Sequence, residues 1–322
     1  MYLGIEIGGT KLQLGVGSGT GGPLVALQRC NVEATRGAEG IRQQIARAAK
    51  PLLDQHGVQR IGVGFGGPVD AAGGRVIKSF QIDGWDGYPL CDWCRNILGL
   101  PAVLENDSNL AGLGEARFGA GRHSRIVFYS NVGSGIGGAL VIDGALYVGG
   151  AGAAVAEVGH LRPGPQAMGS DETVESFASG WGIAAQARAR LADTRTQQQE
   201  AAVQLLAQCG GEIEQLTGKM VVQAAVEGNP LASEIFRGAI RTYGWALAQV
   251  VTLLAPNVLV IGGGVPQVGE TLFLAPLRKE VERYVIPPLR GTYEIVPAAL
   301  GEEVVLHGAL ALAAGNAPPS ST

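Results

Sequence analysis

Hydrophobic residues alternate with polar or small residues at the start of the chain and then recur at helical spacing. Residues 2–7 and 12–16 alternate in the manner of β-strands, a glycine turn separates them, and residues 24–27 extend the same sheet. Apolar positions between residues 38 and 56 follow the spacing of an amphipathic helix, and residues 61–65 form a further apolar run. This order predicts an α/β domain that opens with two strands joined by a tight turn.

A second apolar run, over residues 101–104, leads into the polar sequence Glu105-Asn106-Asp107, after which apolar residues recur at helical spacing. Asp107 is therefore predicted to lie where a strand ends and a helix begins, which is where open α/β sheets bind ligands. A carboxylate there can accept a proton from a bound hydroxyl, while Asn106 hydrogen-bonds a neighbouring hydroxyl. The alternative is that Asp107 only caps the helix, since Asp and Asn are favoured N-cap residues.

The pattern of strand, glycine turn and strand returns near the start of the second half. Residues 126–131 and 139–142 are β-like, and a glycine turn, Gly133–Gly138, separates them. Asp143-Gly144 predicts a hairpin after the second of these strands. We interpret residues 117–125 as the connection between two halves of the chain. Because strand, glycine turn and strand follow one another near the start of each half, we predict two related domains.

Helices and one more buried strand follow. Helices are predicted at residues 173–191, 201–208, 231–254 and 304–314. Gly238 and Gly244 are expected to interrupt the longest of them. Residues 258–261 predict a buried strand that ends in a third glycine run, Gly262–Gly264. Residues 316–322 are predicted to be a disordered tail.

Composition limits the classes of partner. The net charge is −4 without a cluster of Lys and Arg, so we expect no nucleic-acid partner. No apolar run reaches about 18 residues and no basic segment precedes the first strand, so we expect neither a membrane span nor a signal peptide. Cys91-Asp-Trp-Cys94 has the spacing of a redox or zinc motif but no second ligand pair nearby, and a helix over residues 90–98 is favoured. A cytoplasmic protein is expected.

The glycine turns suggest a phosphate ligand. Each can aim backbone N–H groups at an anion, and one turn in each half would hold a polyphosphate from both sides. Thr10 can add a hydroxyl, and Glu6 can hold Mg²⁺ through water. Gly262–Gly264 can let a nucleotide lie against the backbone. For each run the alternative is a tight hairpin without a ligand, but three runs at strand ends together favour a nucleotide site.

A hydroxyl near Asp107 is then the expected phosphoryl acceptor. Glu157, His160 and Glu175 supply further hydrogen-bonding groups of the kind that a sugar requires. For His160 taken alone, an ordinary core or surface histidine remains the alternative.

Taken together, these segments resemble the repressor, open-reading-frame and kinase (ROK) family of sugar kinases, within the actin-like ATPase superfamily. The matching segments are residues 7–11, 64–68, 105–109 with Glu115, 133–138, 157–160, 175–180 and 261–265. The resemblance implies an α/β fold with two actin-like (ribonuclease H-like) domains and a cleft between them. We place these domains at residues 1–118 and 119–302, with a C-terminal helix, 303–315, packing back on the first.

The resemblance also implies roles for individual residues. Asp107 would be the general base. The hexose contacts would be Gly67, Asn106, Asp107, Glu157, His160 and Glu175. The ATP contacts would be Gly8, Gly9, Thr10, Lys11, Gly133, Ser134, Gly135, Gly137, Gly262, Gly263 and Gly264. Mg²⁺ would be held by Glu6 through water, although the family usually has Asp at that position, and the family suggests a homodimer.

The leading hypothesis is an ATP-dependent hexokinase that phosphorylates the 6-hydroxyl of glucose. N-acetylglucosamine, N-acetylmannosamine, mannose and fructose stay open as substrates. A sugar-responsive repressor is an alternative from another class, but the helix-turn-helix that such family members carry before the first phosphate motif has no counterpart before Glu6. A sugar-binding protein that has lost catalysis is a third alternative, supported by the glutamate at position 6.

One departure from the family predicts that structural zinc is absent. Family members commonly carry Cys-x-Cys-Gly-x-x-Gly-Cys after the Glu-x-Gly-His motif, where three cysteines join the histidine. Here the cysteine positions fall on Gln166, Met168 and Thr173. An amide, a thioether and a hydroxyl are poor zinc ligands beside the one imidazole of His160.

Overall fold

The computed structural model describes residues 1–150, 155–164, 167, 169–193 and 199–315. The chain divides into two compact units. Unit 1 comprises Met1–Tyr129, Ala139–Ala156 and Ala298–Thr322, and unit 2 comprises Ser130–Gly138 and Glu157–Pro297. The domain boundaries expected from the sequence stay a prediction, and the expected disordered tail, residues 316–322, lies outside the described residues.

Unit 1 is built on a five-stranded sheet with the order β3-β2-β1-β4-β7. The strands are β1 (Tyr2–Ile7), β2 (Lys11–Gly17), β3 (Ala26–Asn31), β4 (Arg60–Phe65) and β7 (Ala102–Asn106). β1, β2 and β3 pair in antiparallel fashion, whereas β1, β4 and β7 run parallel. The carboxyl ends of β1, β4 and β7 therefore lie at one edge of the sheet, and each is followed by a segment that the sequence predicts to be functional.

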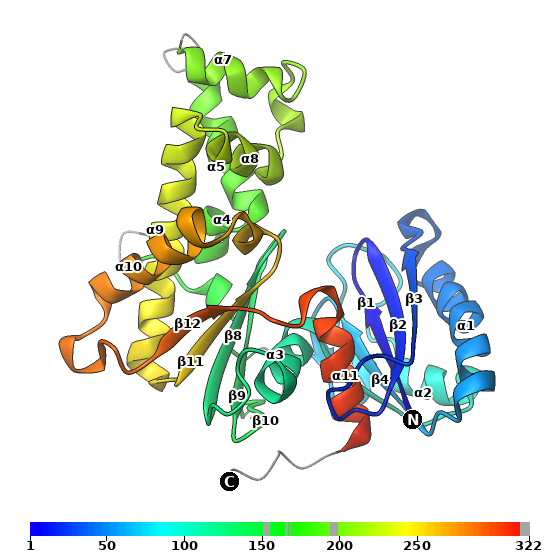
Figure 1. Cartoon of the computed structure of the whole chain (residues 1–322). Helices are drawn as coiled ribbons and strands as arrows, with labels where there is room; N and C mark the ends of the chain where they lie inside the picture. The colour runs from blue at the N-terminus through cyan, green and yellow to red at the C-terminus, as the bar shows by residue number, and fades with distance from the viewer. Residues whose placement is uncertain (151–154, 165–166, 168, 194–198, 316–322) are drawn as a thin grey trace. The chain divides into compact units, whose positions relative to one another are not determined.

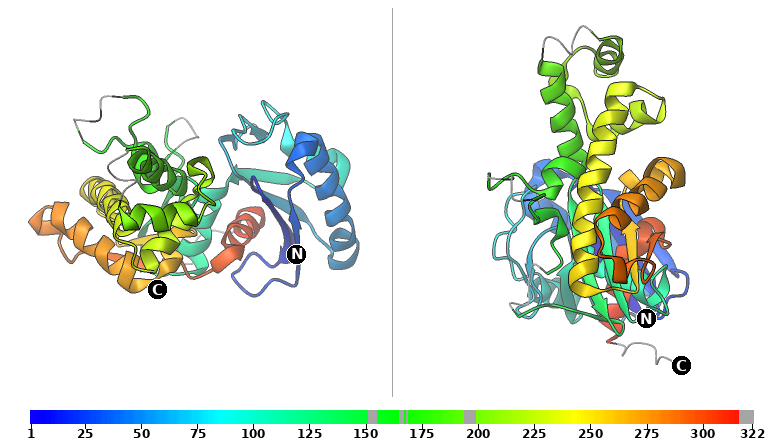
Figure 2. Two further views of the ribbon diagram at one scale, coloured as in Figure 1. Left: turned by 90° about the horizontal axis from the view of Figure 1, so that it is seen from above. Right: turned by 90° about the vertical axis from the view of Figure 1, so that its left-hand side faces the viewer.

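Helices cover both faces of this sheet. α11 (Val304–Ala314) packs against β1 and β4, and α1 (Gly37–His56) lies on the opposite face (Figures 1 and 2). α3 (Asp107–Phe118) packs against α11. At these contacts backbone lies directly against backbone, with no room for a side chain between. A Cβ on Gly62 would lie 2.0 Å from the carbonyl oxygen of Ala309, and one on Gly308 would lie 1.9 Å from that of Leu110. Part of the chain's high glycine content thus serves helix packing.

Smaller elements complete unit 1. They are η1 (Ala34–Arg36), the hairpin of β5 (Val69–Asp70) and β6 (Arg75–Val76), α2 (Leu90–Trp93), η2 (Cys94–Leu98) and η8 (Gly301–Glu303). α2 and η2 confirm the helical interpretation of the two-cysteine motif. Burial raises the pKa of the Cys91 thiol to about 11 and raises that of Cys94 further, so both thiols are held in the unreactive protonated form.

A second sheet has the order β10-β9-β8-β11-β12. Its strands are β8 (Ile126–Val132), β9 (Ile136–Ile142), β10 (Ala145–Leu146), β11 (Val258–Gly262) and β12 (Glu294–Pro297). The division into units runs through β8 and β9, since residues 130–138 group with unit 2. Asp143 and Gly144 have φ angles of 51° and 71°, as a type I′ turn requires, which confirms the predicted hairpin.

Helices form most of unit 2. They are α4 (Val174–Ala178), α5 (Gly180–Ala192), α7 (Glu200–Ala207), α8 (Gly218–Val226), α9 (Pro230–Leu254) and α10 (Ala275–Tyr284). The described part of unit 2 also contains shorter helical segments, which are η3 (Val158–His160), η4 (Ile213–Gln215), η5 (Val265–Val268), η6 (Glu270–Leu274) and η7 (Pro287–Leu289). α9 is the long helix that α8 and α10 pack against (Figure 2).

Two helix predictions were wrong. The helix expected over residues 173–191 is broken at Ser179, whose extended ψ of 170° ends α4 and whose hydroxyl accepts the N–H of Gly182 to begin α5. The interruptions expected at Gly238 and Gly244 do not occur, because α9 is continuous. Gly244 instead allows α10 to pack closely against α9, since a Cβ at this position would lie 2.6 Å from the Cβ of Glu280.

Other differences are smaller. β3 begins two residues later than the strand predicted at 24–27 and extends further along the chain, while α8, α10 and β12 were not predicted. Among the residues that the structure describes, no helix has the length and apolar character needed to cross a membrane. The predicted α/β class with two sheets is confirmed.

Candidate active-site residues in each unit

In unit 1, the predicted catalytic and sugar-binding residues gather at one edge of the sheet. The side-chain amide of Asn106, at the end of β7, donates to the carbonyl of Gly67, just after β4, over 3.1 Å. A Cβ on neighbouring Gly66 would lie 3.3 Å from Oδ2 of Asp107 and 3.6 Å from the Cα of Gly8, which follows β1. The structure therefore brings Gly8, Gly67, Asn106 and Asp107 together, as the parallel strands require.

The contacts at the start of α3 distinguish between the two interpretations of Asp107, as a general base or as a helix cap. Asn106 is the N-cap, and its side-chain oxygen accepts the N–H groups of Ser108 and Asn109 at 2.9 and 3.2 Å. Asp107 is the first helical residue, and its Oδ1 accepts the N–H of Ser108 at 2.7 Å. The helix N-terminus stabilises its negative charge. Because the cap is Asn106, capping does not account for a carboxylate at position 107.

Two buried glutamates support this helix, and the sequence analysis gave neither a role. Glu105, 7% exposed, accepts the N–H of Asn106 and the side-chain amide of Asn109 at 2.9 and 3.0 Å. Glu115 is fully buried and its carboxylate accepts three backbone N–H groups, those of Ala120, Ala299 and Leu300. Both act as fixed acceptors that hold the ends of α3 in place.

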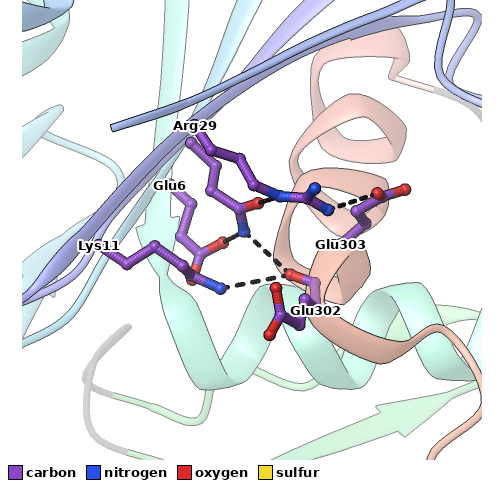
Figure 3. A network of polar contacts seen from close by, with 6 residues as sticks. Glu6, Lys11, Arg29, Glu302 and Glu303 are labelled. Carbon is purple, nitrogen blue, oxygen red and sulfur yellow. Dashed lines mark hydrogen bonds and ion pairs between the residues drawn. The ribbon is translucent and has the colours of Figure 1, made fainter. Parts of the chain in front are cut away.

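The candidate metal ligand, Glu6, lies at the end of β1 with a side chain that is 12% exposed. Its carboxylate accepts from Nε2 of Gln13 at 2.8 Å and lies 3.5 Å from Nζ of Lys11 (Figure 3). Burial raises the pKa of Glu6, while Lys11 and Gln13 lower it. A single carboxylate fits Mg²⁺, which binds proteins through one or two carboxylates and keeps phosphate oxygens and waters as its other ligands. No cluster of three or more acidic, His or Cys side chains suited to a metal occurs in the described part of the chain.

The first glycine turn joins β1 to β2. The N–H of Gly8 donates to the carbonyl of Lys11 at 2.9 Å, and Thr10 is exposed. The side chain of Gln81 covers Gly9 so closely that a Cβ there would lie 1.4 Å from its Oε1. Sequence reasoning missed Gln81, which lies in a loop-rich stretch without a periodic pattern.

In unit 2, the second glycine turn is held by the start of α5 and by Glu175. The N–H of Gly180 donates to the carbonyl of Gly133 at 2.8 Å, and that of Trp181 to Ser134 at 3.3 Å. The N–H of Ile136 donates to Oε2 of Glu175 at 2.5 Å. A predicted sugar contact, Glu175, thus lies against a predicted phosphate turn.

The third glycine run adjoins the same turn. Gly263 has a φ of 94°, and a Cβ there would lie 2.3 Å from the carbonyl oxygen of Val132, the residue before Gly133. Only glycine tolerates both this backbone conformation and this approach. On the other side of the turn, Ser130 Oγ donates to the carbonyl of Gly137 at 2.8 Å. The two ATP-binding segments predicted in this unit are therefore neighbours.

Glu157 is the N-cap residue of η3, and His160 is the last residue of that short helix. The N–H of His160 donates to the carbonyl of Glu157 at 3.0 Å, and both residues are accessible to solvent. Desolvation raises the pKa of Glu157, the positive charge of His160 lowers it, and the negative charge of Glu175 raises it. The pKa of Glu157 therefore responds to the charges of His160 and Glu175, the other two residues of unit 2 that were predicted to bind sugar.

The two remaining residues of interest are Trp181 and Thr173. The indole Nε1 of Trp181, 48% exposed, donates to Oε1 of Glu175 at 3.3 Å, an interaction that sequence reasoning missed. Thr173, which stands at a cysteine position of the family's zinc motif, caps α4 by accepting the N–H of Ser176 at 3.3 Å. Gln166 and Met168 lie outside the described residues, and the absence of zinc stays a prediction.

Comparisons with known proteins identify the family. The model of the ROK family matches residues 2–316. A glucokinase of Streptomyces coelicolor is 34% identical over 318 residues, which cover 97% of each chain, and one of Thermotoga maritima is 32% identical over 315 residues, covering 96% of each. The crystal structure of a ROK family glucokinase from Streptomyces griseus in complex with glucose and AMPPNP superposes with a TM-score of 0.80 at 34% identity, over 98% of this chain and 99% of that one. The chain therefore belongs to the ROK family.

Proposed function

We propose that the protein is an ATP-dependent kinase that transfers the γ-phosphoryl group of ATP to the 6-hydroxyl of glucose. The full-length similarity to glucokinases and to a glucokinase bound to glucose and AMPPNP supports this function. The observation that carries it is local: Asp107 opens α3 beside Asn106 and Gly67, at the carboxyl edge of three parallel strands whose first ends in a glycine turn. This is an arrangement suited to a hydroxyl nucleophile and a phosphate.

In this proposal, Asp107 is the general base. As the oxygen of the 6-hydroxyl forms its bond to the γ-phosphorus, Asp107 accepts the hydroxyl proton. The bond from the γ-phosphorus to the oxygen that bridges it to the β-phosphorus breaks, and ADP leaves with the electron pair. Asn106 and Gly67 hold neighbouring sugar hydroxyls, so that the nucleophile is oriented before transfer.

Further recognition of the sugar is assigned to three residues of unit 2. Glu157 and Glu175 accept hydrogen bonds from hydroxyls, and His160 donates or accepts one. Charge-assisted hydrogen bonds of this kind are stronger than neutral ones and select for the positions of the hydroxyl groups. Mannose, fructose and the N-acetylhexosamines remain alternative substrates, distinguished by those contacts.

The nucleotide is assigned to the glycine segments. Backbone N–H groups of the turns at Gly8–Lys11 and Gly133–Gly138 bind phosphate oxygens, and Gly262–Gly264 lets the adenosine approach the backbone. Glu6 would hold the Mg²⁺ that accompanies ATP through water, and the metal would supply positive charge that neutralises the phosphates. A cytoplasmic location and a homodimer are also part of the proposal, and the homodimer is suggested by the family alone.

The direct test is an ADP-release assay coupled to NADH oxidation, across a panel of hexoses and with or without Mg²⁺. Glucose should give the highest kcat/KM, and omission of Mg²⁺ should abolish turnover. Product analysis should find the phosphate on the 6-hydroxyl. Binding of sugar without ADP release would favour the alternative of a sugar-binding protein, and a higher kcat/KM for another hexose would reassign the substrate.

A further inference from the structure

Three polar side chains stand opposite one another on neighbouring strands of the unit 1 sheet. The register pairs Glu6 of β1 with Gln13 of β2, and Gln13 with Arg29 of β3. Directly opposed residues project from the same face of a sheet, so the three side chains can interact in a row. Figure 3 shows this row, which continues to Glu303.

Gln13 is the centre of the row and is fully buried, which is uncommon for glutamine. Its Nε2 donates to Oε2 of Glu6 at 2.8 Å and to the carbonyl of Glu302 at 3.0 Å. Its Oε1 accepts from Nε of Arg29 at 2.8 Å. The amide therefore has partners on both ends, as a buried polar group requires.

These partners allow the Gln13 amide only one orientation. A guanidinium can only donate, so it must face the amide oxygen, whereas a carboxylate and a carbonyl can only accept, so they must face the NH₂ group. Arg29 is itself held by an ion pair of 2.8 Å between Nη2 and Oε1 of Glu303. The position of the NH₂ group beside Glu6 is thus set by residues from two other elements.

We propose that Gln13 is a positioning residue that fixes the carboxylate of Glu6 for the Mg²⁺ of the nucleotide, an inference that rests on the proposed function. Glutamate has one more rotatable bond than aspartate, and holding a free side chain in one rotamer costs conformational entropy. The Gln13 amide removes that freedom before the metal arrives. Lys11, 38% exposed and 3.5 Å away, is a weaker restraint on the same carboxylate.

A purely structural role is the competing explanation, because Gln13 also donates to the carbonyl of Glu302 in η8, 289 residues along the chain. That role predicts a loss of stability without a change in metal dependence. The two explanations differ in the Mg²⁺ concentration that supports nucleotide binding, which can be measured without turnover.

The test is calorimetric titration of the full-length protein with AMPPNP at a series of Mg²⁺ concentrations. Gln13→Met keeps the volume but removes the hydrogen bonds. We expect the Mg²⁺ concentration for half-maximal AMPPNP binding to rise roughly tenfold or more, the usual effect of losing a residue that orients a metal ligand. Binding of glucose alone should be unchanged.

Gln44 offers a matched control within the same unit. It is also buried, and its Nε2 donates to the carbonyl of Asn31 and to Oε1 of Glu33 at 3.1 and 3.3 Å, while its Oε1 accepts the N–H of Glu33. Gln44→Met removes the same kinds of bond and should lower the melting temperature without moving the Mg²⁺ dependence. An equal Mg²⁺ shift in this variant would overturn the inference.

A double-mutant cycle makes the assignment specific. If Gln13 acts through Glu6, Gln13→Met should add no further Mg²⁺ shift in a Glu6→Gln background. Full additivity, or no shift in Gln13→Met alone, would overturn the inference. Should Gln13→Met not fold, Arg29→Met, at a half-exposed position, removes one support of the amide and should produce a smaller shift in the same direction. Whether the parent protein phosphorylates glucose tests the proposed function separately from these shifts in Mg²⁺ dependence.

Discussion

The two strand–glycine turn–strand motifs use carboxylates in opposite ways. In unit 1, Glu6 precedes the turn on the strand itself and is held by side chains of the neighbouring strand. In unit 2, Glu175 comes from a helix and accepts a backbone N–H of the turn, that of Ile136. The same backbone motif is thus prepared for two tasks. The first turn follows an acid that we assign to Mg²⁺, while the second turn is hydrogen-bonded to an acid that we assign to the sugar.

This difference suggests a division of labour. Unit 1 contributes the proposed base and the proposed metal ligand, Asp107 and Glu6, whereas the charged residues of unit 2 are assigned to recognition. Substitutions of Asp107 or Glu6 should therefore act mainly on kcat or on the Mg²⁺ requirement, and substitutions of the charged residues of unit 2 should act mainly on the affinity for glucose.

The largest effect is expected from Asp107→Asn. The amide cannot accept the hydroxyl proton, so kcat should fall by at least about 10²-fold while the calorimetric Kd for glucose changes little. Asp92, an exposed aspartate in the first turn of α2, provides the control, and Asp92→Asn should leave kcat unchanged. Near-normal turnover by Asp107→Asn would show that Asp107 is not the general base and has only a structural role at the start of α3.

The second-largest effect is expected from a substitution in unit 2. Glu175→Gln retains an oxygen for the N–H of Ile136 but loses the charged hydrogen bond to the sugar, so the KM for glucose should rise roughly 10- to 100-fold with a smaller change in kcat. Glu234→Gln, which removes an exposed ion pair with Arg190, should have no such effect. A fall in kcat with an unchanged KM would contradict the assignment of Glu175 to recognition.

The position of Asp107 shows which parts of the site follow from sequence. An apolar run followed by Asn-Asp and helical spacing is a local signal, and the strand–helix junction appears where that signal predicts it. The same holds for β1, the glycine turn after it and α11, since each depends on the pattern of a few consecutive residues. Local periodicity is strong evidence because one face of each element must be buried.

Gln13 and Trp181 show what local patterns leave out. The role of Gln13 depends on the register of three strands and on the return of the chain at Glu302, and no periodicity encodes either. Trp181 contacts Glu175 only because the chain breaks at Ser179, and a broken helix keeps nearly the periodicity of a continuous one. Interactions that depend on tertiary pairing need the structure.

A third prediction uses the pKa of Glu157. Desolvation raises this pKa above its ordinary value of 4.5, so the carboxylate becomes protonated at a higher pH than an exposed glutamate does. The ionised form accepts the sugar hydroxyl, so affinity is full above the raised pKa and is lost as the pH falls through it, by about tenfold per unit below.

Calorimetric titration of glucose from about pH 7.5 down to pH 4.5, the ordinary pKa of a glutamate, should show this weakening as the pH falls. Glu157→Gln should bind glucose more weakly at neutral pH but with a flatter pH dependence, because the titrating group is gone. An unchanged pH profile in Glu157→Gln would assign the titration to another group and remove Glu157 from the sugar contacts.

The smallest effect is expected from Trp181→Phe. The substitution keeps an aromatic ring at the start of α5 but removes the indole N–H that donates to Oε1 of Glu175 at 3.3 Å. The acceptor is a carboxylate, but the bond is long and the indole is 48% exposed, so we expect the loss to be only about 0.5–1.5 kcal/mol. The KM for glucose should therefore rise by roughly two- to tenfold while kcat stays within about a factor of two. Trp245→Phe, at a half-buried tryptophan of α9, is the control and should leave KM unchanged.

Combining Trp181→Phe with Glu175→Gln sharpens the test: if the indole acts only by orienting the carboxylate, the double variant should have the KM of Glu175→Gln alone. Additive effects would mean instead that Trp181 contacts the sugar itself.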